Sequence, residues 1–200
     1  MQYKIISFYS EPESDSTYYT NHAKRFISEC EKYDLDYHVE ELKGEGNYFK
    51  NCRLKAGFIQ SCMDKFKMPL VWLDIDTYIE RSPDIDNLSN VDFAGVKRLQ
   101  TIEKPKPRKF YGDRSGDRND KSFKSGYPIF AHCLFFNSTP NSLKVLETWK
   151  SLCDKEQGAN IGDHSLLCKT LTDKKVEYKF IDDFTKYTLA PVSMVKSKER

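Results

Sequence analysis

The sequence predicts an α/β domain in which a mainly parallel central sheet carries helices on both of its faces. Short apolar segments of strand length alternate with longer segments in which apolar residues recur every three or four positions. One segment, Pro69–Leu73, lacks charged residues, as expected for a central strand that is covered on both faces. The length of 200 residues suits one substantial core, so we expect residues 1–200 to form a single domain.

The first part of the chain contains three expected strands and two expected helices. The first helix should begin after Ser16 or Thr17, because either hydroxyl can act as its N-cap. The second strand should end at the turn-forming cluster 44–47. In order, we expect a strand at Tyr3–Tyr9, a helix at Tyr18–Tyr33, a strand at Asp36–Leu42, a helix at Asn51–Phe66 and a strand at Pro69–Leu73.

The second part repeats the alternation and adds a long basic segment. We expect strands at Val91–Val96, Ile129–Phe136 and Val176–Ile181, and helices at Ser142–Cys153 and Asp163–Leu171. Between them, Lys97–Lys124 holds ten Lys and Arg residues against four Asp and Glu, with little periodicity. Loops this long inside a domain are usually functional or disordered. A solvated insertion is the simpler alternative, but the local positive excess favours a flexible basic loop at about residues 97–126 that covers an anionic ligand.

Composition excludes some classes of function. The formal net charge of +2 argues against a dedicated nucleic-acid binder. No apolar run is long enough for a transmembrane segment. The six cysteines are scattered without the spacing of a zinc site or a disulfide framework, which favours a reducing, cytoplasmic location.

An acidic pair follows the apolar strand directly. Asp74 and Asp76 are two positions apart, and in extended backbone both side chains would point to the same side. In parallel sheets ligands bind at the carboxyl ends of the strands. Two neighbouring carboxylates repel each other unless a cation lies nearby, and oxygen ligands suit Mg²⁺ or Mn²⁺. The simpler alternative is a loop start with two solvated acids.

Several motifs, in this order, resemble the nucleotide-diphospho-sugar transferases of the GT-A fold, a Rossmann-like fold. The resemblance extends over roughly residues 3–187 and includes the compact glycosyltransferase domains of large algal viruses and some bacteria. The stretches that carry it are Asn51–Ile59, Val71–Asp76, Ser82-Pro83, Asp92–Arg98, Cys133–Pro140 with the helix that ends at Trp149, and Gly162–Leu167.

For the donor, the resemblance implies a metal-dependent site around the family's DxD motif. Asp76 matches the second acid of that motif and would bind Mn²⁺ or Mg²⁺, while Asp74 would contact the ribose or belong to the metal shell. Tyr9 and Ser10 would border the nucleoside. Two basic residues at the start of the second helix, Arg53 and Lys55, would lie near the nucleotide or the sugar.

For the reaction, the resemblance implies a hexosyltransferase-type enzyme that takes a nucleotide sugar, with UDP-sugar favoured, and a glycan or glycoprotein acceptor. Asp163 matches an acid of the family's late Asp-Gln motif and would face the transferred sugar or the acceptor, whereas His164 replaces the usual Gln. An inverting enzyme needs a base for the acceptor hydroxyl, and Asp163, His164 and His132 are the candidates. Each has a simpler alternative: an N-cap for Asp163, a surface residue for His164 and a core residue for His132.

Two other functions remain open at this stage. A haloacid-dehalogenase-like phosphatase also has an apolar strand followed by Asp-x-Asp, although that strand normally lies near the N-terminus. A nucleotide-sugar-binding module could keep the fold without turnover, because a fold does not fix a function. Release of a nucleoside diphosphate from a nucleotide sugar would distinguish these possibilities.

Overall fold

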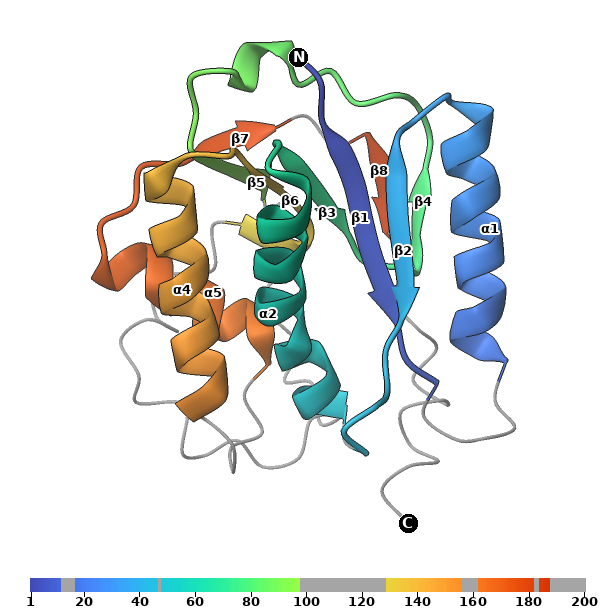
Figure 1. Cartoon of the computed structure of the whole chain (residues 1–200), viewed down its shortest axis with the longest axis horizontal. Coiled ribbons are helices and arrows are strands. Elements are labelled where there is room, and N and C mark those ends of the chain that lie inside the picture. The colour runs from blue at the N-terminus through green and yellow to red at the C-terminus, as the bar shows by residue number, and fades with distance from the viewer. Residues whose placement is uncertain (12–16, 47, 98–128, 156–161, 182–183, 188–200) are drawn as a thin grey trace, which may run out of the picture.

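The computed structural model describes residues 1–11, 17–46, 48–97, 129–155, 162–181 and 184–187 (Figure 1). Strands and helices alternate along the first half of the chain, as the apolar pattern predicts. In chain order the elements are β1 (Lys4–Tyr9), α1 (Tyr18–Lys32), β2 (Tyr37–Glu41), α2 (Tyr48–Phe66), β3 (Leu70–Leu73), β4 (Thr77–Ile79), the 3₁₀ helix η1 (Asp86–Leu88), β5 (Phe93–Lys97), β6 (Ile129–Phe136), α4 (Pro140–Lys155), α5 (Asp163–Asp173), β7 (Lys179–Ile181) and β8 (Thr185–Tyr187).

The central sheet has six strands in the order β2-β1-β3-β6-β5-β7. The pairs β1–β2, β1–β3 and β5–β7 are parallel, whereas β6 runs antiparallel to both of its neighbours. The predicted mainly parallel sheet is therefore confirmed, with one reversed strand at its centre. A second sheet pairs β4 with β8 in antiparallel fashion.

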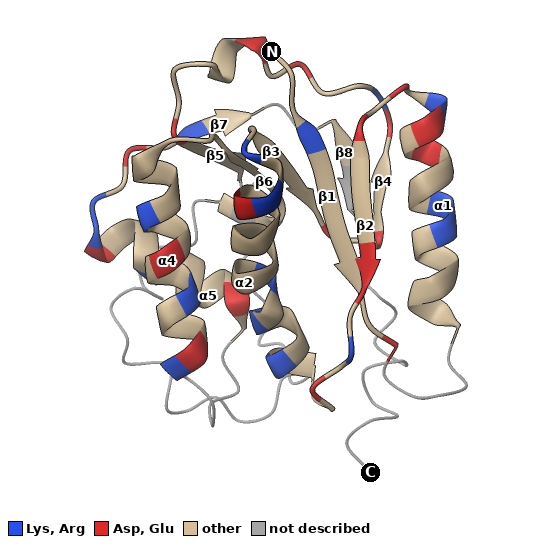
Figure 2. Cartoon of the chain, in the orientation of Figure 1, with Lys and Arg blue, Asp and Glu red and all other residues tan. Residues whose placement is uncertain are grey.

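Helices cover both faces of this sheet, as predicted. In Figure 1, α1 lies on one side of the strands, while α2, α4 and α5 lie on the other. The core accordingly has two parts, one between the sheet and α1 around Phe26 and Phe135, and one between the sheet and the other helices around Trp72 and Trp149. Charged residues are concentrated on the helices and near strand ends in Figure 2.

Strand β6 contains an irregularity that matters for the site. Gly95 of β5 pairs with Leu134, but the next residue, Val96, pairs with Phe130, so residues 131–133 of β6 have no partner on β5. Gly95 allows the close approach that this register requires, since a Cβ atom there would lie 2.4 Å from Cγ2 of Ile129. The backbone of the bulge is consequently available to groups outside the sheet.

Element boundaries differ modestly from the expected ones. Helix α2 begins at Tyr48 rather than Asn51, and α4 begins at Pro140 rather than Ser142. The N-cap of α1 is Thr17, one of the two residues predicted, although its side chain makes no capping hydrogen bond. Short elements without a clear apolar pattern, β4, η1 and β8, were not expected. None of the helices in the described part of the chain has the length and apolarity needed to cross a lipid bilayer.

Candidate functional site

The predicted acidic pair lies at the carboxyl end of β3, in the middle of the sheet. All four residues of β3 are buried, and the chain then turns sharply, because the Thr77 N–H donates to the Asp74 carbonyl at 2.9 Å. The expected extended geometry between Asp74 and Asp76 is thus wrong, and a turn places the two carboxylates instead. The Asp74 N–H also donates to the carbonyl of His132 at 2.8 Å, which ties this turn to the β6 bulge.

A buried lysine joins the acidic pair to the second predicted acid. Nζ of Lys55, in α2, lies 2.8 Å from Oδ1 of Asp74 and 2.6 Å from Oδ2 of Asp163. It also donates to the carbonyl of Ala131, in the β6 bulge, at 3.2 Å. One ammonium group thus makes two ion pairs and one hydrogen bond with a carbonyl. Lys55 therefore holds Asp74, Asp163 and β6 together, and its predicted contact with a nucleotide stays a prediction.

The charges in this cluster are strongly coupled. Burial lowers the pKa of Lys55, but the charges of Asp163 and Asp74 outweigh burial and raise that pKa overall. Burial raises the pKa of Asp163, against the opposing charge of Lys55. Burial, with the charge of Asp74 as the next cause, raises the pKa of Asp76 to about 7. The Asp76 carboxyl is thus buried close to the negative charge of Asp74, with Lys55 and Arg25 as the nearby positive charges that oppose this effect.

Asp163 is not the N-cap of its helix. Gly162 takes that position, with extended backbone, and Asp163 is the first residue of α5. The Asp163 carbonyl accepts a hydrogen bond from Nε1 of Trp149 at 3.0 Å, and its carboxylate is turned toward Lys55. The simpler alternative of a capping role is therefore wrong, and a paired, buried carboxylate takes its place.

His164 contacts the bulge in β6, and His132 is part of that bulge. Nδ1 of His164 accepts the N–H of Ala131 at 3.2 Å, so in the neutral ring the proton is on Nε2. This tautomer presents no free lone pair on Nε2 for an acceptor proton, which favours Asp163 over His164 as a base. His132 is a buried residue of β6.

The other predicted site residues are more dispersed. Ser10, just after β1, is buried, and a Cβ atom on Gly44 would lie 2.6 Å from its Oγ. The Tyr9 hydroxyl donates to Glu41 at 3.2 Å. Arg53 is buried, but it is two residues from Lys55 on a helix and so points in a different direction. It lines a pocket of about 400 Å³ between α2 and α4.

Sequence reasoning missed several residues that build the site. Nε1 of Trp72 donates to Oδ1 of Asp74 at 2.9 Å, so this oxygen is held by both Trp72 and Lys55. The thiol of Cys52, in α2, lies near Asp163, and burial together with this charge raises its pKa. From α1, on the other face of the sheet, Arg25 contacts the carbonyls on either side of Asp76, and Glu29 contacts the N–H of Ile79 in β4. The i, i+4 spacing of Arg25 and Glu29 was visible in the sequence, whereas their target was not.

Two further predictions find different outcomes. The basic loop at about 97–126 lies outside the described residues, apart from its first residue. None of the six cysteines, all in described parts of the chain, forms a disulfide.

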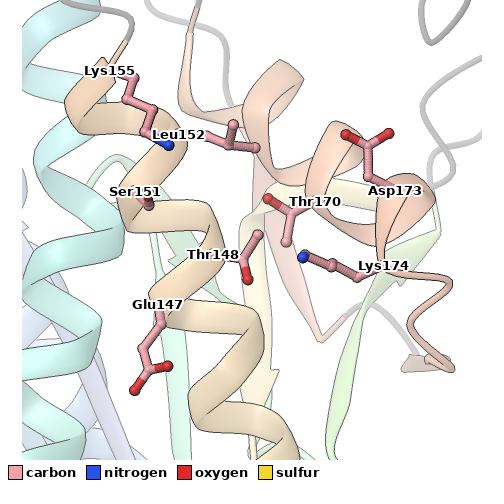
Figure 3. A pocket seen from close by; sticks show the side chains of 8 residues that line it. All are labelled: Glu147, Thr148, Ser151, Leu152, Lys155, Thr170, Asp173 and Lys174. Carbon is pink, nitrogen blue, oxygen red and sulfur yellow. The ribbon is translucent and has the colours of Figure 1, made fainter.

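A separate pocket of about 440 Å³ lies between α4 and α5, where residues such as Glu147, Thr170 and Lys174 line it (Figure 3). It contains none of the predicted site residues and mixes both signs of charge.

Comparison with known proteins establishes the fold. No model of a protein family matches the sequence, and no curated protein sequence matches it. Among solved structures, the chain is similar to a glycosyltransferase involved in the glycosylation of the major capsid of PBCV-1. The sequence identity is 15%, the TM-score is 0.57, and the match covers 90% of this chain and 80% of that chain. The chain shares the fold of this glycosyltransferase.

The acidic pair at the end of β3 has the donor chemistry that a divalent cation needs. Within the described residues, no group of three or more His, Cys, Asp and Glu side chains could hold a metal ion by itself. Mg²⁺ is commonly bound through one or two carboxylates and completes its shell with water and substrate phosphates. Asp76 and the second oxygen of Asp74 match that arrangement. The acidic pair at the end of β3 therefore supplies oxygen donors of the kind that such an ion uses.

Proposed function

We propose that this chain is a metal-dependent glycosyltransferase that moves a sugar from a nucleoside-diphosphate sugar, with UDP-sugar favoured, to a hydroxyl group of a glycan or glycoprotein. One observation carries the proposal: at the carboxyl end of β3, Lys55 joins Asp163 to Asp74, the first acid of the Asp74 and Asp76 pair. The glycosyltransferase fold supports it, because this edge of an α/β sheet is where ligands bind.

The donor half of the site follows from the charges. Asp76, with the second oxygen of Asp74, would hold Mn²⁺ or Mg²⁺. Such a cation would stabilise the negative charge that grows on the leaving diphosphate as the glycosidic bond breaks. Lys55 and Trp72 fix the first oxygen of Asp74, so this carboxylate keeps one orientation whether or not a donor is bound. Tyr9, Ser10 and Arg53 remain proposed contacts of the nucleotide.

The acceptor half of the site centres on Asp163. A transferred sugar passes through a state with positive charge at its anomeric carbon, as in glycoside hydrolysis. An ionised Asp163 would stabilise that charge or, in an inverting reaction, take the proton of the acceptor hydroxyl. Burial raises the pKa of Asp163, which makes its carboxylate a stronger base, while Lys55 keeps it ionised. His164 would position Ala131 and thereby the Lys55 contact.

The test is donor cleavage in the absence of acceptor, measured as nucleoside diphosphate released from UDP-, GDP- and dTDP-sugars with Mn²⁺. We expect release by the wild type with one donor, and loss of release in Asp76→Asn. Asp64→Asn, an exposed acid of α2, is the matched control and should keep full activity.

Other results would select the alternative functions. Calorimetric binding of a nucleotide sugar without release of nucleoside diphosphate would indicate a binding module. Hydrolysis of a simple phosphate ester with no nucleotide-sugar binding would favour a phosphatase. Release that Asp76→Asn leaves unchanged would contradict the proposed metal site.

A further inference from the structure

Arg25 of helix α1 binds the backbone on either side of Asp76. Nη2 of Arg25 donates to the carbonyl of Ile75 at 3.1 Å, and Nη1 donates to the carbonyl of Thr77 at 3.0 Å. These two carbonyls belong to the residues on either side of Asp76. One planar guanidinium therefore binds the backbone both before and after the proposed metal ligand, which uses the fork geometry that arginine has and lysine lacks.

Arg25 is itself held firmly. Glu29, one turn further along α1, accepts from Nη1 of Arg25 with both oxygens at 2.9 Å. The guanidinium also lies 3.7 Å from the ring centroid of Tyr78 and 3.2 Å from Nδ1 of His22. The Arg25 and Glu29 side chains are only 22% and 18% exposed, so water competes little for these contacts.

Glu29 adds a contact of its own. Its Oε2 accepts the N–H of Ile79, in β4, at 2.8 Å. The two side chains together bind the backbone of Ile75, in the turn, and of Thr77 and Ile79, in β4. Charge-assisted hydrogen bonds of this kind are roughly twice as strong as neutral ones. We call this pair the Arg25–Glu29 clamp.

The geometry determines what the clamp fixes. The direction of the Asp76 side chain depends on the peptide planes on both sides of its Cα. Arg25 holds the Ile75–Asp76 plane through the Ile75 carbonyl, and the hydrogen bond from Thr77 to Asp74 holds the Asp76–Thr77 plane. Arg25 then holds the next plane through the Thr77 carbonyl. With its backbone fixed in this way, Asp76 keeps only the rotations of its own side chain.

We propose that the Arg25–Glu29 clamp positions Asp76 for the divalent cation and so sets the affinity of the site for that cation. This inference rests on the proposed function, because it assigns the clamp to the same site. The clamp acts on the backbone around Asp76, so Arg25 and Glu29 are positioning residues. Residues that orient metal ligands typically change metal affinity by about 10–100-fold when they are substituted.

The decisive variant is Arg25→Lys, which keeps the positive charge but cannot bind both carbonyls at once. Mn²⁺ affinity is measured by electron paramagnetic resonance of the free ion, with Mn²⁺ alone and with UDP. We expect Arg25→Lys to fold with a cooperative transition and to bind Mn²⁺ roughly 10-fold or more weakly. Arg81→Lys, the same substitution at an exposed position after β4, should match the wild type.

Glu29→Gln provides an independent variant if Arg25→Lys fails to fold. It removes the charge that holds Arg25 but keeps an oxygen for the Ile79 N–H, so a smaller loss of Mn²⁺ affinity is expected. In both variants, hydrogen exchange at Thr77 and Ile79 should become faster while exchange in β1 stays unchanged.

Each outcome decides the question. Mn²⁺ affinity within about twofold of the wild type in folded Arg25→Lys would overturn the inference, given the scale expected for such residues. Loss of folding in both variants would assign the clamp to general stability and would also overturn it. A wild type that binds neither Mn²⁺ nor a nucleotide sugar would contradict the proposed function itself, which is a different result.

Discussion

Lys55 carries a buried positive charge that compensates the negative charges of two carboxylates. Its side chain is 7% exposed, and that of Asp163 is 9% exposed. Removal of one partner from a buried ion pair typically destabilises a protein by about 3–5 kcal/mol, because the remaining charges lose their compensation. We expect a loss of that size in Lys55→Met, measured by urea denaturation. Lys65→Met, at an exposed position of the same helix, is the control, and a loss in Lys55→Met no larger than in this control would contradict the bridging role.

One substitution of Asp163 can distinguish a structural role of its carboxylate from a catalytic role. Asp163→Asn keeps the size of the side chain but cannot ionise, so it cannot accept a proton or balance a positive charge. Positioned proton transfer is commonly worth about 10²–10⁴ in rate. At saturating donor and acceptor we expect kcat to fall at least about a hundredfold, in a variant that still unfolds cooperatively. Asp173→Asn, an exposed acid at the end of the same helix, should keep its turnover, and an equal kcat in both variants would remove Asp163 from the reaction.

At the scale of elements, the β6 bulge depends on one glycine. A Cβ atom at position 95 would meet the β-branched side chain of Ile129 at 2.4 Å and Leu134 at 3.2 Å. Buried β-branched side chains have little freedom to move, and overpacking of this kind costs about 1–3 kcal/mol. We expect Gly95→Ala to lower the free energy of unfolding by that amount and to reduce activity, because the bulge carries the Lys55 and His164 contacts.

Gly57 provides the opposite case within the same protein. A Cβ atom there would lie 3.6 Å from the Lys150 side chain, an ordinary contact, and the residue is inside a helix. Gly57→Ala should therefore leave stability unchanged or raise it by up to about 1 kcal/mol. If both alanine variants were equally stable, the close approach at Gly95 would not be a real constraint.

The direction and packing of the strands and helices are also what the sequence could not predict. The spacing of apolar residues and the length of each segment predicted the main helices and the strand before Asp74, because such elements depend on local burial. The reversed direction of β6 leaves no mark on that pattern, since a strand covered on both faces reads the same in either direction. The Lys55–Asp163 pair joins residues 108 positions apart, and only the packing of α5 against α2 and β6 brings them together. The contacts of Arg25 with the carbonyls of Ile75 and Thr77 were hidden as well, because a backbone acceptor leaves no mark in the sequence.

For the whole molecule, ligand binding should appear as added thermal stability. A ligand that binds only the native state at 100 times its Kd adds about 2.7 kcal/mol, which is roughly 5–10 °C for a protein of this size. We expect one nucleotide sugar among UDP-, GDP-, CMP- and dTDP-sugars to raise Tm in this way with Mn²⁺, and much less without it. In Asp76→Asn, the part of the Tm increase that depends on Mn²⁺ should be lost. No shift with any donor would contradict nucleotide-sugar binding.

The central place of β6 has a consequence for how the chain is made. A ribosome that has synthesised residues 1–97 has produced β1 to β5, yet β3 and β5 are not neighbours and need β6 between them. Until residues 129–136 emerge, the apolar β3 is an open strand edge, and such edges invite pairing with other chains. The carbonyls of Ala131 and His132 that complete the site arrive with the same late strand. The pairing that covers the edge of β3 and the assembly of the site are thus one late event in synthesis. In a nascent chain that stalls before β6, the edge of β3 stays open and the site stays incomplete.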